Sequence, residues 1–545
     1  FSVWAGDYDE FKAEGAVNFA VVEDKALVRL AGFFQSHDGY QYNLFSQSRL
    51  GNTQRANARF SLTLRPTDTF SNDLVIDYGE SKGNNLSSVA YTTFEIGEGN
   101  PFVPANFLYS PLVDTAFGPG AWDAFLAAHP GADPEGWVAS IKKQQARGPH
   151  TVDVDGPNFH LARNLLVSNV TTVELSEGLK LRGILGYTRI RSSNASEFDG
   201  TPFPADDNGE EGRGGTLEQF SAELQLAGET AGGLSYVTGL YYSDEDDDTR
   251  SLSVLFDLLP AAPPVLQIND GVVSNETAAI YAQGTLDISG WTGVDGLSFT
   301  LGGRYSEEDV QFLRNPDDTF IANPPPPGAV FVNPLEDTFK QFSWTVGLDY
   351  QATDEWLLYL VSRRSFRSGG FNYFAPPLEG FGNDGGAEYE EERATDIEAG
   401  AKFAGSLGGM PVRLNLAAYK MWIDDIQRSN YVAIFGALAG ITVNVPEAQI
   451  YGFEFDGEVK PTNWLSVGGS LTYTNAEFTD NVVSVLGNPA VAFGPYPDTP
   501  EWSAAAYADV RLPLNDRFDL AVRADVYHQT SNFFSSTGNT LNPGT

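Results

Sequence analysis

Apolar and polar residues alternate with a period of two through most of this sequence. In residues 297–305, for example, Leu297, Phe299 and Leu301 alternate with Ser298 and Thr300. The same alternation recurs in residues 11–19, 59–65, 220–226 and 412–418. Successive side chains of a β-strand point to opposite faces of the sheet. Each segment therefore predicts a strand with one apolar and one strongly polar face.

About nineteen such segments follow one another along the chain. They lie near residues 1–8, 10–20, 25–36, 53–65, 69–80, 158–175, 178–190, 215–227, 234–244, 275–287, 296–308, 339–351, 355–370, 391–404, 411–427, 441–458, 463–477, 501–512 and 517–530. Most exceed the roughly five to six residues that are usual in soluble sheets. They reach the roughly nine to eleven residues that a membrane-spanning strand needs.

The connections alternate between short and long from the second strand onward. The short ones lie at 21–24, 66–68, 176–177, 228–233, 288–295, 352–354, 405–410, 459–462 and 513–516. The long ones lie at 37–52, 81–157, 191–214, 245–274, 309–338, 371–390, 428–440 and 478–500. Outer-membrane barrels have this layout, with short periplasmic turns at one end and long extracellular loops at the other. We therefore predict an all-β, transmembrane, antiparallel up-and-down barrel with a long extracellular loop at 81–157.

The number of strands indicates a large barrel. Nineteen strands exceed both the small eight-stranded barrels and the open porins of roughly 16–18 strands, and the next class is the 22-stranded transporter with a plugged lumen. The soluble alternatives fit less well. A propeller should repeat a blade of roughly 40–50 residues, and the sequence has no such repeat. A sandwich buries the inner faces of its strands, whereas nearly every strand here has one strongly polar face.

The composition excludes several classes of protein. The 545 residues include 72 acidic and 33 basic side chains, a net charge of −39, and no cysteine. This charge argues against nucleic acid as a partner, and the lack of cysteine excludes thiol catalysis and zinc ribbons. No motif of a hydrolase, a zinc protease or a P-loop enzyme occurs. We expect no enzymatic activity, no bound metal and no cofactor. No apolar run is long enough for a transmembrane helix, and no signal peptide is visible.

Two kinds of loop segment carry further predictions. Residues 135–146 predict a helix with Asp133 and Pro134 as its N-cap and first residue, and residues 122–128 predict a second, shorter helix. The acidic stretches at 244–248 and 388–392 are interpreted as solvated loop charge. The alternative is binding of a divalent cation at a surface rich in lipopolysaccharide.

Residues 351–372 closely resemble a barrel segment of the TonB-dependent outer-membrane receptors, in which a turn and an apolar strand lead into Ser-Gly-Gly-Phe-Asn at 368–372. Residues 389–404 resemble the strand that follows in that family. Three further stretches resemble later family segments in the same order. They are residues 414–427, which end in Trp-Ile-Asp-Asp-Ile-Gln, residues 448–457 (Ala-Gln-Ile-Tyr-Gly-Phe-Glu-Phe-Asp-Gly) and residues 497–502 (Pro-Asp-Thr-Pro-Glu-Trp). Residues 15–18 and 29–40 resemble the first barrel hairpin, so the resemblance spans nearly the whole chain.

The resemblance implies a transporter in the outer membrane of a Gram-negative bacterium. It would take up a scarce ligand, such as siderophore-bound iron, cobalamin or an oligosaccharide, with energy from the proton motive force delivered through TonB. It also implies that residues 1–545 are a partial barrel without the family's N-terminal plug domain and about three C-terminal strands. The expected partners are outer-membrane lipid and lipopolysaccharide, TonB, and a small-molecule or metal-chelate ligand.

The candidate ligand contacts are aromatic and polar residues placed near the rim and in the loops: Asn372, Tyr373, Phe374, Phe435 and Trp122. Packing of loop against loop is the alternative for each of them. The acidic loops favour a neutral or cationic ligand over a strongly anionic chelate.

Other functions stay open at this point. A passive porin-like channel would lack the plug. A secreted β-rich carbohydrate-active enzyme would need two carboxylates facing each other at roughly 5–10 Å. A surface adhesin is a further, minor alternative.

Overall fold

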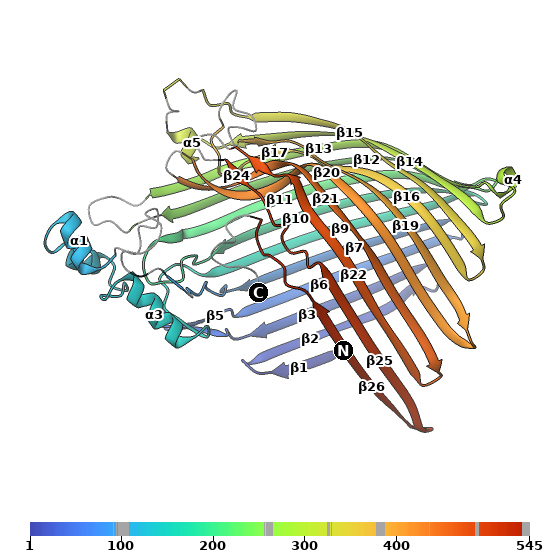
Figure 1. Ribbon diagram of the computed structural model, residues 1–545, viewed down its shortest axis with the longest axis horizontal. Helices are drawn as coiled ribbons and strands as arrows, with labels where there is room; N and C mark the ends of the chain where they lie inside the picture. The colour runs from blue at the N-terminus through green and yellow to red at the C-terminus, as the bar shows by residue number, and fades with distance from the viewer. Residues whose placement is uncertain are drawn as a thin grey trace.

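The computed structural model describes residues 1–90, 92, 93, 95, 108–255, 257, 265–323, 327, 328, 330–377, 387–434, 437–484 and 490–536. Nineteen strands form one antiparallel sheet in which each strand pairs with its neighbours in the chain (Figure 1). Within the described residues β1 pairs only with β2, and β26 pairs only with β25. The predicted all-β, up-and-down meander of about nineteen strands is confirmed.

The strands of this sheet are β1 (Ser2–Gly6), β2 (Glu10–Val22), β3 (Ala26–His37), β6 (Thr53–Thr67), β7 (Phe70–Gly83), β9 (Phe159–Ser176), β10 (Leu179–Ala195), β11 (Asp206–Glu229), β12 (Leu234–Leu255), β13 (Val265–Asp287), β14 (Leu297–Arg314), β15 (Leu335–Thr353), β16 (Trp356–Arg367), β19 (Glu392–Leu407), β20 (Met410–Ile434), β21 (Ala437–Thr462), β22 (Leu465–Asp480), β25 (Trp502–Asn515) and β26 (Phe518–Gln529).

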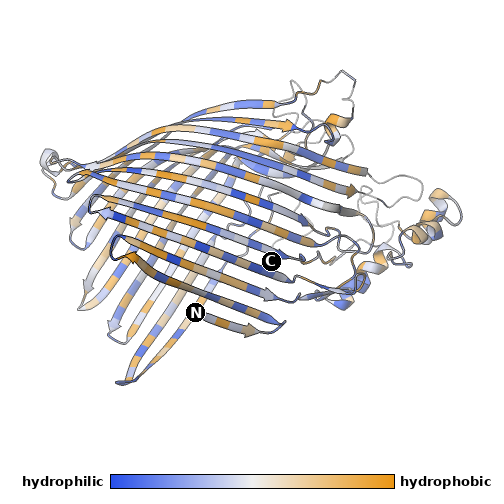
Figure 2. Cartoon of the chain, turned by 180° about the vertical axis from the view of Figure 1, so that it is seen from behind, coloured by the Kyte–Doolittle hydropathy of each residue, from blue (hydrophilic) through white to orange (hydrophobic). Residues whose placement is uncertain are grey.

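The two faces of the sheet differ in polarity, as the alternation predicts. Arg304 and Arg363 lie on one face, which we call the polar face. Leu301 and Phe342 lie on the opposite, apolar face, where they are 56% and 57% exposed. Figure 2 shows the resulting alternation along the strands. A whole face of exposed large apolar side chains is unfavourable in water and is typical of a surface that contacts lipid.

Several strands, among them β11, β12, β13, β14 and β20, continue past their predicted ends toward the long loops. β12 stays paired with β13 from Leu234 to Leu255. The prediction that the acidic stretch 244–248 is a loop is therefore wrong. The second acidic stretch begins in a short strand, β18 (Glu388–Tyr389), and ends at the first residue of β19.

In the described part of the connection between β7 and β9 there are three helices, α1 (Ser110–Phe117), α2 (Ala121–Ala128) and α3 (Trp137–Arg147). The predicted helices at 122–128 and 135–146 correspond to α2 and α3, whereas α1 is not predicted from the sequence. Asp133 is not the N-cap of α3, because Gly136 holds that position. Asp133 instead accepts a hydrogen bond from the backbone N–H of Glu135 and pairs with Lys143. Among the described residues, no helix is both long and apolar enough to cross a membrane.

Shorter elements gather mostly at the long-loop end of the sheet. β4 (Gln41–Asn43), β5 (Ser48–Leu50) and β8 (Thr151–Val152) form a small sheet of their own. β17 (Gly370–Phe371) pairs with β18, and β23 (Val482–Val483) pairs with β24 (Val491–Ala492). The helix α5 (Thr319–Ala322) follows β14, whereas α4 (Ser289–Thr292) lies in the short connection between β13 and β14.

Candidate ligand vestibule at the long-loop end

Oppositely charged side chains pair across the polar face. Arg363 on β16 contacts Asp396 and Glu398 on β19, each at 2.8 Å. The Tyr359 hydroxyl donates a hydrogen bond to Glu398 at 2.7 Å. Because the Arg363 side chain is 46% exposed, such pairs add at most about 1 kcal/mol of stability each. Their effect is to hold polar groups in fixed positions along a solvent-accessible wall.

A segment that follows β16 lies across this polar face. We call residues 369–377 the strap. Its second and third residues form β17, which pairs with β18. A Cβ on Gly369 would come within 2.3 Å of the Tyr389 carbonyl oxygen, so only glycine fits at this crossing. The two adjacent glycines therefore let the chain leave β16 and turn onto the polar face.

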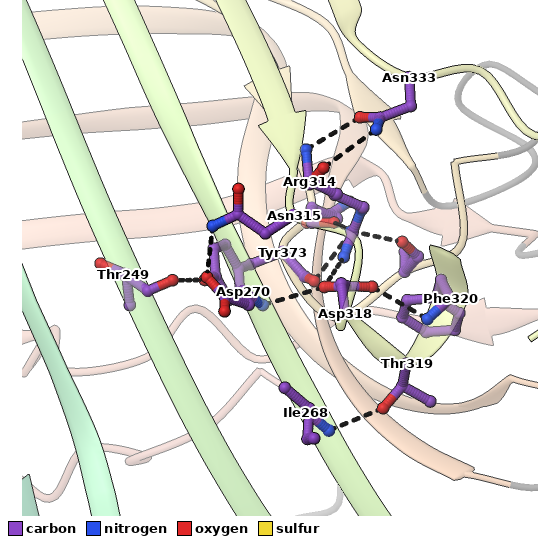
Figure 3. A network of polar contacts seen from close by, with 12 residues as sticks. Thr249, Ile268, Asp270, Arg314, Asn315, Asp318, Thr319, Phe320, Asn333 and Tyr373 are labelled. Atoms are coloured by element: carbon purple, nitrogen blue, oxygen red, sulfur yellow. Dashed lines mark hydrogen bonds and ion pairs between the residues drawn. The ribbon is translucent and has the colours of Figure 1, made fainter. Parts of the chain in front are cut away.

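Arg314, the last residue of β14, anchors the strap (Figure 3). Its side chain is only 1% exposed. One guanidinium nitrogen, Nη2, donates to the carbonyl oxygens of Asn372, Tyr373 and Ala375 at 3.1, 2.9 and 2.7 Å. The other, Nη1, donates to the carboxylate of Asp318 at 2.9 Å. Three strap carbonyls thus share one buried cation.

Asp318 completes this anchor and is itself fully buried. Its carboxylate also accepts hydrogen bonds from the backbone N–H groups of Asp270 at 3.0 Å and Phe320 at 2.9 Å. Burial lowers the pKa of Arg314, and Asp318 opposes that change. Arginine stays protonated in proteins, so the pair is a buried salt bridge whose charges are compensated by hydrogen bonds.

Asn372 fastens the strap to β21. Its side chain is buried; the amide nitrogen donates to the Thr442 carbonyl at 2.8 Å, and the amide oxygen accepts from the Thr442 N–H at 2.7 Å. β22 pairs with β21 only as far as Glu447. The Asn372 amide therefore continues the ladder beyond the end of β22 and satisfies a backbone edge that would otherwise lack a partner.

The next two strap residues are aromatic and pack against the sheet. The Tyr373 ring stacks on Phe312 with 5.3 Å between ring centroids, and its hydroxyl donates to the Thr249 carbonyl on β12. Burial raises the pKa of Tyr373 well above its usual range. Phe374 packs against a buried cluster that includes Ile423 and Val443. The strap therefore connects β12, β14 and β21 at the long-loop end.

The family model described as TonB dependent receptor-like, beta-barrel matches residues 100–545. The chain belongs to the TonB-dependent receptor family. This family consists of receptors and transporters rather than enzymes, and its members are outer-membrane β-barrels.

Solved structures share the fold of this TonB-dependent receptor barrel. The ferric yersiniabactin uptake receptor FyuA from Yersinia pestis is 15% identical, with a TM-score of 0.66 over 97% of this chain and 68% of that one. The siderophore receptor PiuA from Acinetobacter baumannii is 14% identical, with a TM-score of 0.64 over 97% of this chain and 71% of that one. The ferric citrate transporter FecA is 12% identical, with a TM-score of 0.60 over 97% and 61%.

The receptor barrel brings together three of the five predicted ligand contacts, Asn372, Tyr373 and Phe374, because all three lie on the strap. Trp122 lies elsewhere, in the core of the helical unit, and is 3% exposed. Phe435 lies outside the described residues. Ligand contact by these five side chains stays a prediction, while the four that are described all have packing partners.

Sequence reasoning misses Arg314 and Asp318, the two residues that anchor the strap. Arg314 follows Arg304 at even spacing, so the alternation of β14, continued through residues 309–314, places both on the polar face. Because residues 309–338 are predicted to be a long loop, the alternation is not followed past residue 308, and Arg314 is not recognised as a residue of the polar face. Within the described ranges, no group of three or more His, Cys, Asp or Glu side chains is arranged to hold a metal ion.

Asn372→Ala is expected to loosen the strap at β21. The change leaves the N–H and C=O of Thr442 without partners, which costs about 1–3 kcal/mol. Hydrogen exchange of the full-length protein in detergent should become faster at residues 369–377 and 440–444. Thr442→Ala is the matched control, because Thr442 bonds to Asn372 through its backbone. Unchanged exchange in Asn372→Ala would contradict the stabilising role of the hydrogen bonds between the Asn372 side chain and Thr442.

Proposed function

We propose that this chain is the barrel portion of an outer-membrane transporter that takes up a siderophore-type iron complex with energy delivered through TonB. The observation that carries the proposal is the match of the family model to residues 100–545. The polar face and the strap support it, because together they place fixed hydrogen-bonding groups and aromatic side chains at the end where long loops surround the sheet.

The choice of ligand class rests on the structural neighbours and on charge. The three neighbours named above are, by their names, receptors or transporters for a ferric complex or a siderophore. They favour siderophore-bound iron over cobalamin or an oligosaccharide. The net charge of −39 repels strongly anionic complexes on approach. We therefore propose a neutral or cationic iron complex as the transported form.

We further propose that about three more strands join β26 to β1 and that a plug domain fills the lumen. Within the described residues β1 and β26 each have one unpaired edge, and a sheet that spans a bilayer must have its edges paired. A total near twenty-two strands is the size of barrel that holds a plug. TonB would act on the plug, and lipopolysaccharide and lipid would surround the apolar face.

Uptake of radiolabelled iron complexes tests this function. The full-length gene is expressed in a Gram-negative host that lacks its own iron-complex receptors. Neutral hydroxamate complexes should be accumulated, whereas a strongly anionic catecholate complex should be accumulated less. Accumulation should stop when the host tonB gene is deleted or an uncoupler is added. Uptake that persists under both conditions would indicate a passive channel and overturn active transport. Uptake of cobalamin alone would overturn the ligand class.

A further inference from the structure

Side chains on the apolar face mark where the sheet leaves the membrane. On β7, β10 and β11 an outward aromatic residue is followed, two positions closer to the long loops, by a charged one. The pairs are Tyr78 and Glu80, Tyr187 and Arg189, and Phe220 and Glu218. Aromatic girdles of this kind lie at the interface between the hydrocarbon and the headgroups. The charged residues therefore lie at the height of the lipid headgroups.

Three arginines cluster at this height on the same side of the sheet. Arg163 on β9 lies directly opposite Arg191 on β10, and Arg189 lies two residues away along β10. Arg163 pairs with Glu80 at 2.8 Å and Arg189 with Glu218 at 2.9 Å. Arg191 is exposed and makes no ion pair within the described residues. Like charges directly opposite each other on neighbouring strands are destabilising. Glu80 offsets the charge of Arg163, and an anion between the two arginines would offset that of Arg191 as well.

The surface between the two arginines is hollowed. A depression of about 270 Å³ is lined by Leu161, Arg163, Arg191, Ser193 and Thr216, together with parts of Ser192 and Gly215. Guanidinium groups bind phosphate oxygens through paired hydrogen bonds, and the two hydroxyls add further donors. Leu185, which is 49% exposed, lies on the same face toward the membrane centre, where an acyl chain would pass.

We propose that Arg163 and Arg191 bind the phosphate group of an outer-leaflet glycolipid, with its acyl chains against the apolar face of β9 and β10. Acidic side chains elsewhere on the apolar face restrict phosphate binding to the surface around β9 and β10. On β12 and β13, two and three strands beyond β10, the same face carries Asp244, Asp246 and Glu276, which repel phosphate. The proposal rests on the proposed placement in the outer membrane.

Native mass spectrometry of the full-length protein in detergent tests the site. The probes are bis-phosphorylated lipid A, the same lipid without phosphate, and inorganic phosphate. The double variant Arg163→Gln/Arg191→Gln should bind bis-phosphorylated lipid A about tenfold more weakly per arginine removed. Arg191→Lys keeps the charge and should lose less. The control is Arg182→Gln, which lies on β10 but on the polar face and should bind like wild type.

Equal binding by wild type and the double variant overturns the site. Displacement of the lipid by millimolar inorganic phosphate would indicate a free-anion site and overturn the lipid assignment. Equal binding of the phosphorylated and dephosphorylated lipids would show that only the acyl chains are recognised, and it would overturn phosphate binding by the two arginines. If the protein does not insert into membranes, wild type and Arg182→Gln also bind no lipid, which is a failure of the proposed function.

Discussion

Arg314→Ala is expected to detach the strap from the polar face and to cost about 3–5 kcal/mol locally. The reason is that the substitution leaves the Asp318 carboxylate buried without a cation. Asp318 is fully buried, and Arg314 is the cation that compensates it. The change also removes the donor shared by the carbonyls of Asn372, Tyr373 and Ala375. Hydrogen exchange at residues 369–377 of the full-length protein should rise by at least about a hundredfold.

Two further variants isolate the cause. Arg304→Ala removes the same side chain from the same face of β14, but Arg304 contacts Ser306 and aromatic rings rather than a buried carboxylate. It should leave the strap protected. Arg314→Met/Asp318→Leu removes both charges together and should cost less than Arg314→Ala, because no uncompensated charge is left buried. Equal exchange in Arg314→Ala and Arg304→Ala would contradict the anchoring role.

The fold could be predicted because membrane strands carry an unusually clear pattern. Where one face contacts lipid and the other does not, every second residue is constrained, and the centres of all nineteen strands follow from the sequence. The strand ends could not be predicted in the same way. Toward the long loops both faces carry charge, as Asp244 and Glu245 do on opposite faces of β12. The alternation then vanishes although the pairing continues.

The strap could be predicted only in part. Paired glycines next to an aromatic segment indicate a bend at the rim, and Asn372, Tyr373 and Phe374 follow from their position there. Their partners do not follow, because the contacts join distant parts of the chain. Asn372 meets Thr442 and Tyr373 meets Thr249, at separations of 70 and 124 residues. A local pattern carries no information about such pairs in a single sequence.

Trp122→Ala is expected to unfold the helical unit between β7 and β9. Trp122 is 3% exposed and stacks on Phe125 at 5.4 Å between ring centroids. Phe125 in turn stacks on Phe203, which comes from the connection between β10 and β11. Truncating a buried tryptophan typically costs about 3–5 kcal/mol, and Trp122 is the largest buried side chain of the apolar cluster that joins these helices. Hydrogen exchange should rise throughout α1, α2 and α3 while β7 and β9 stay protected.

Trp122→Phe separates packing from ligand contact at this position. Phenylalanine keeps most of the aromatic stack and loses the hydrogen bond from Nε1 to the Pro134 carbonyl at 3.3 Å. If Trp122 acts only in packing, this variant should keep both the protection of the helices and the affinity for the iron complex. A lower affinity with unchanged protection would place Trp122 in the ligand site. Trp291→Ala is the control, since Trp291 is 80% exposed in the short connection that holds α4. Exchange in Trp122→Ala no faster than in Trp291→Ala would contradict the packing role, because the helical unit would then be held together without its largest buried side chain.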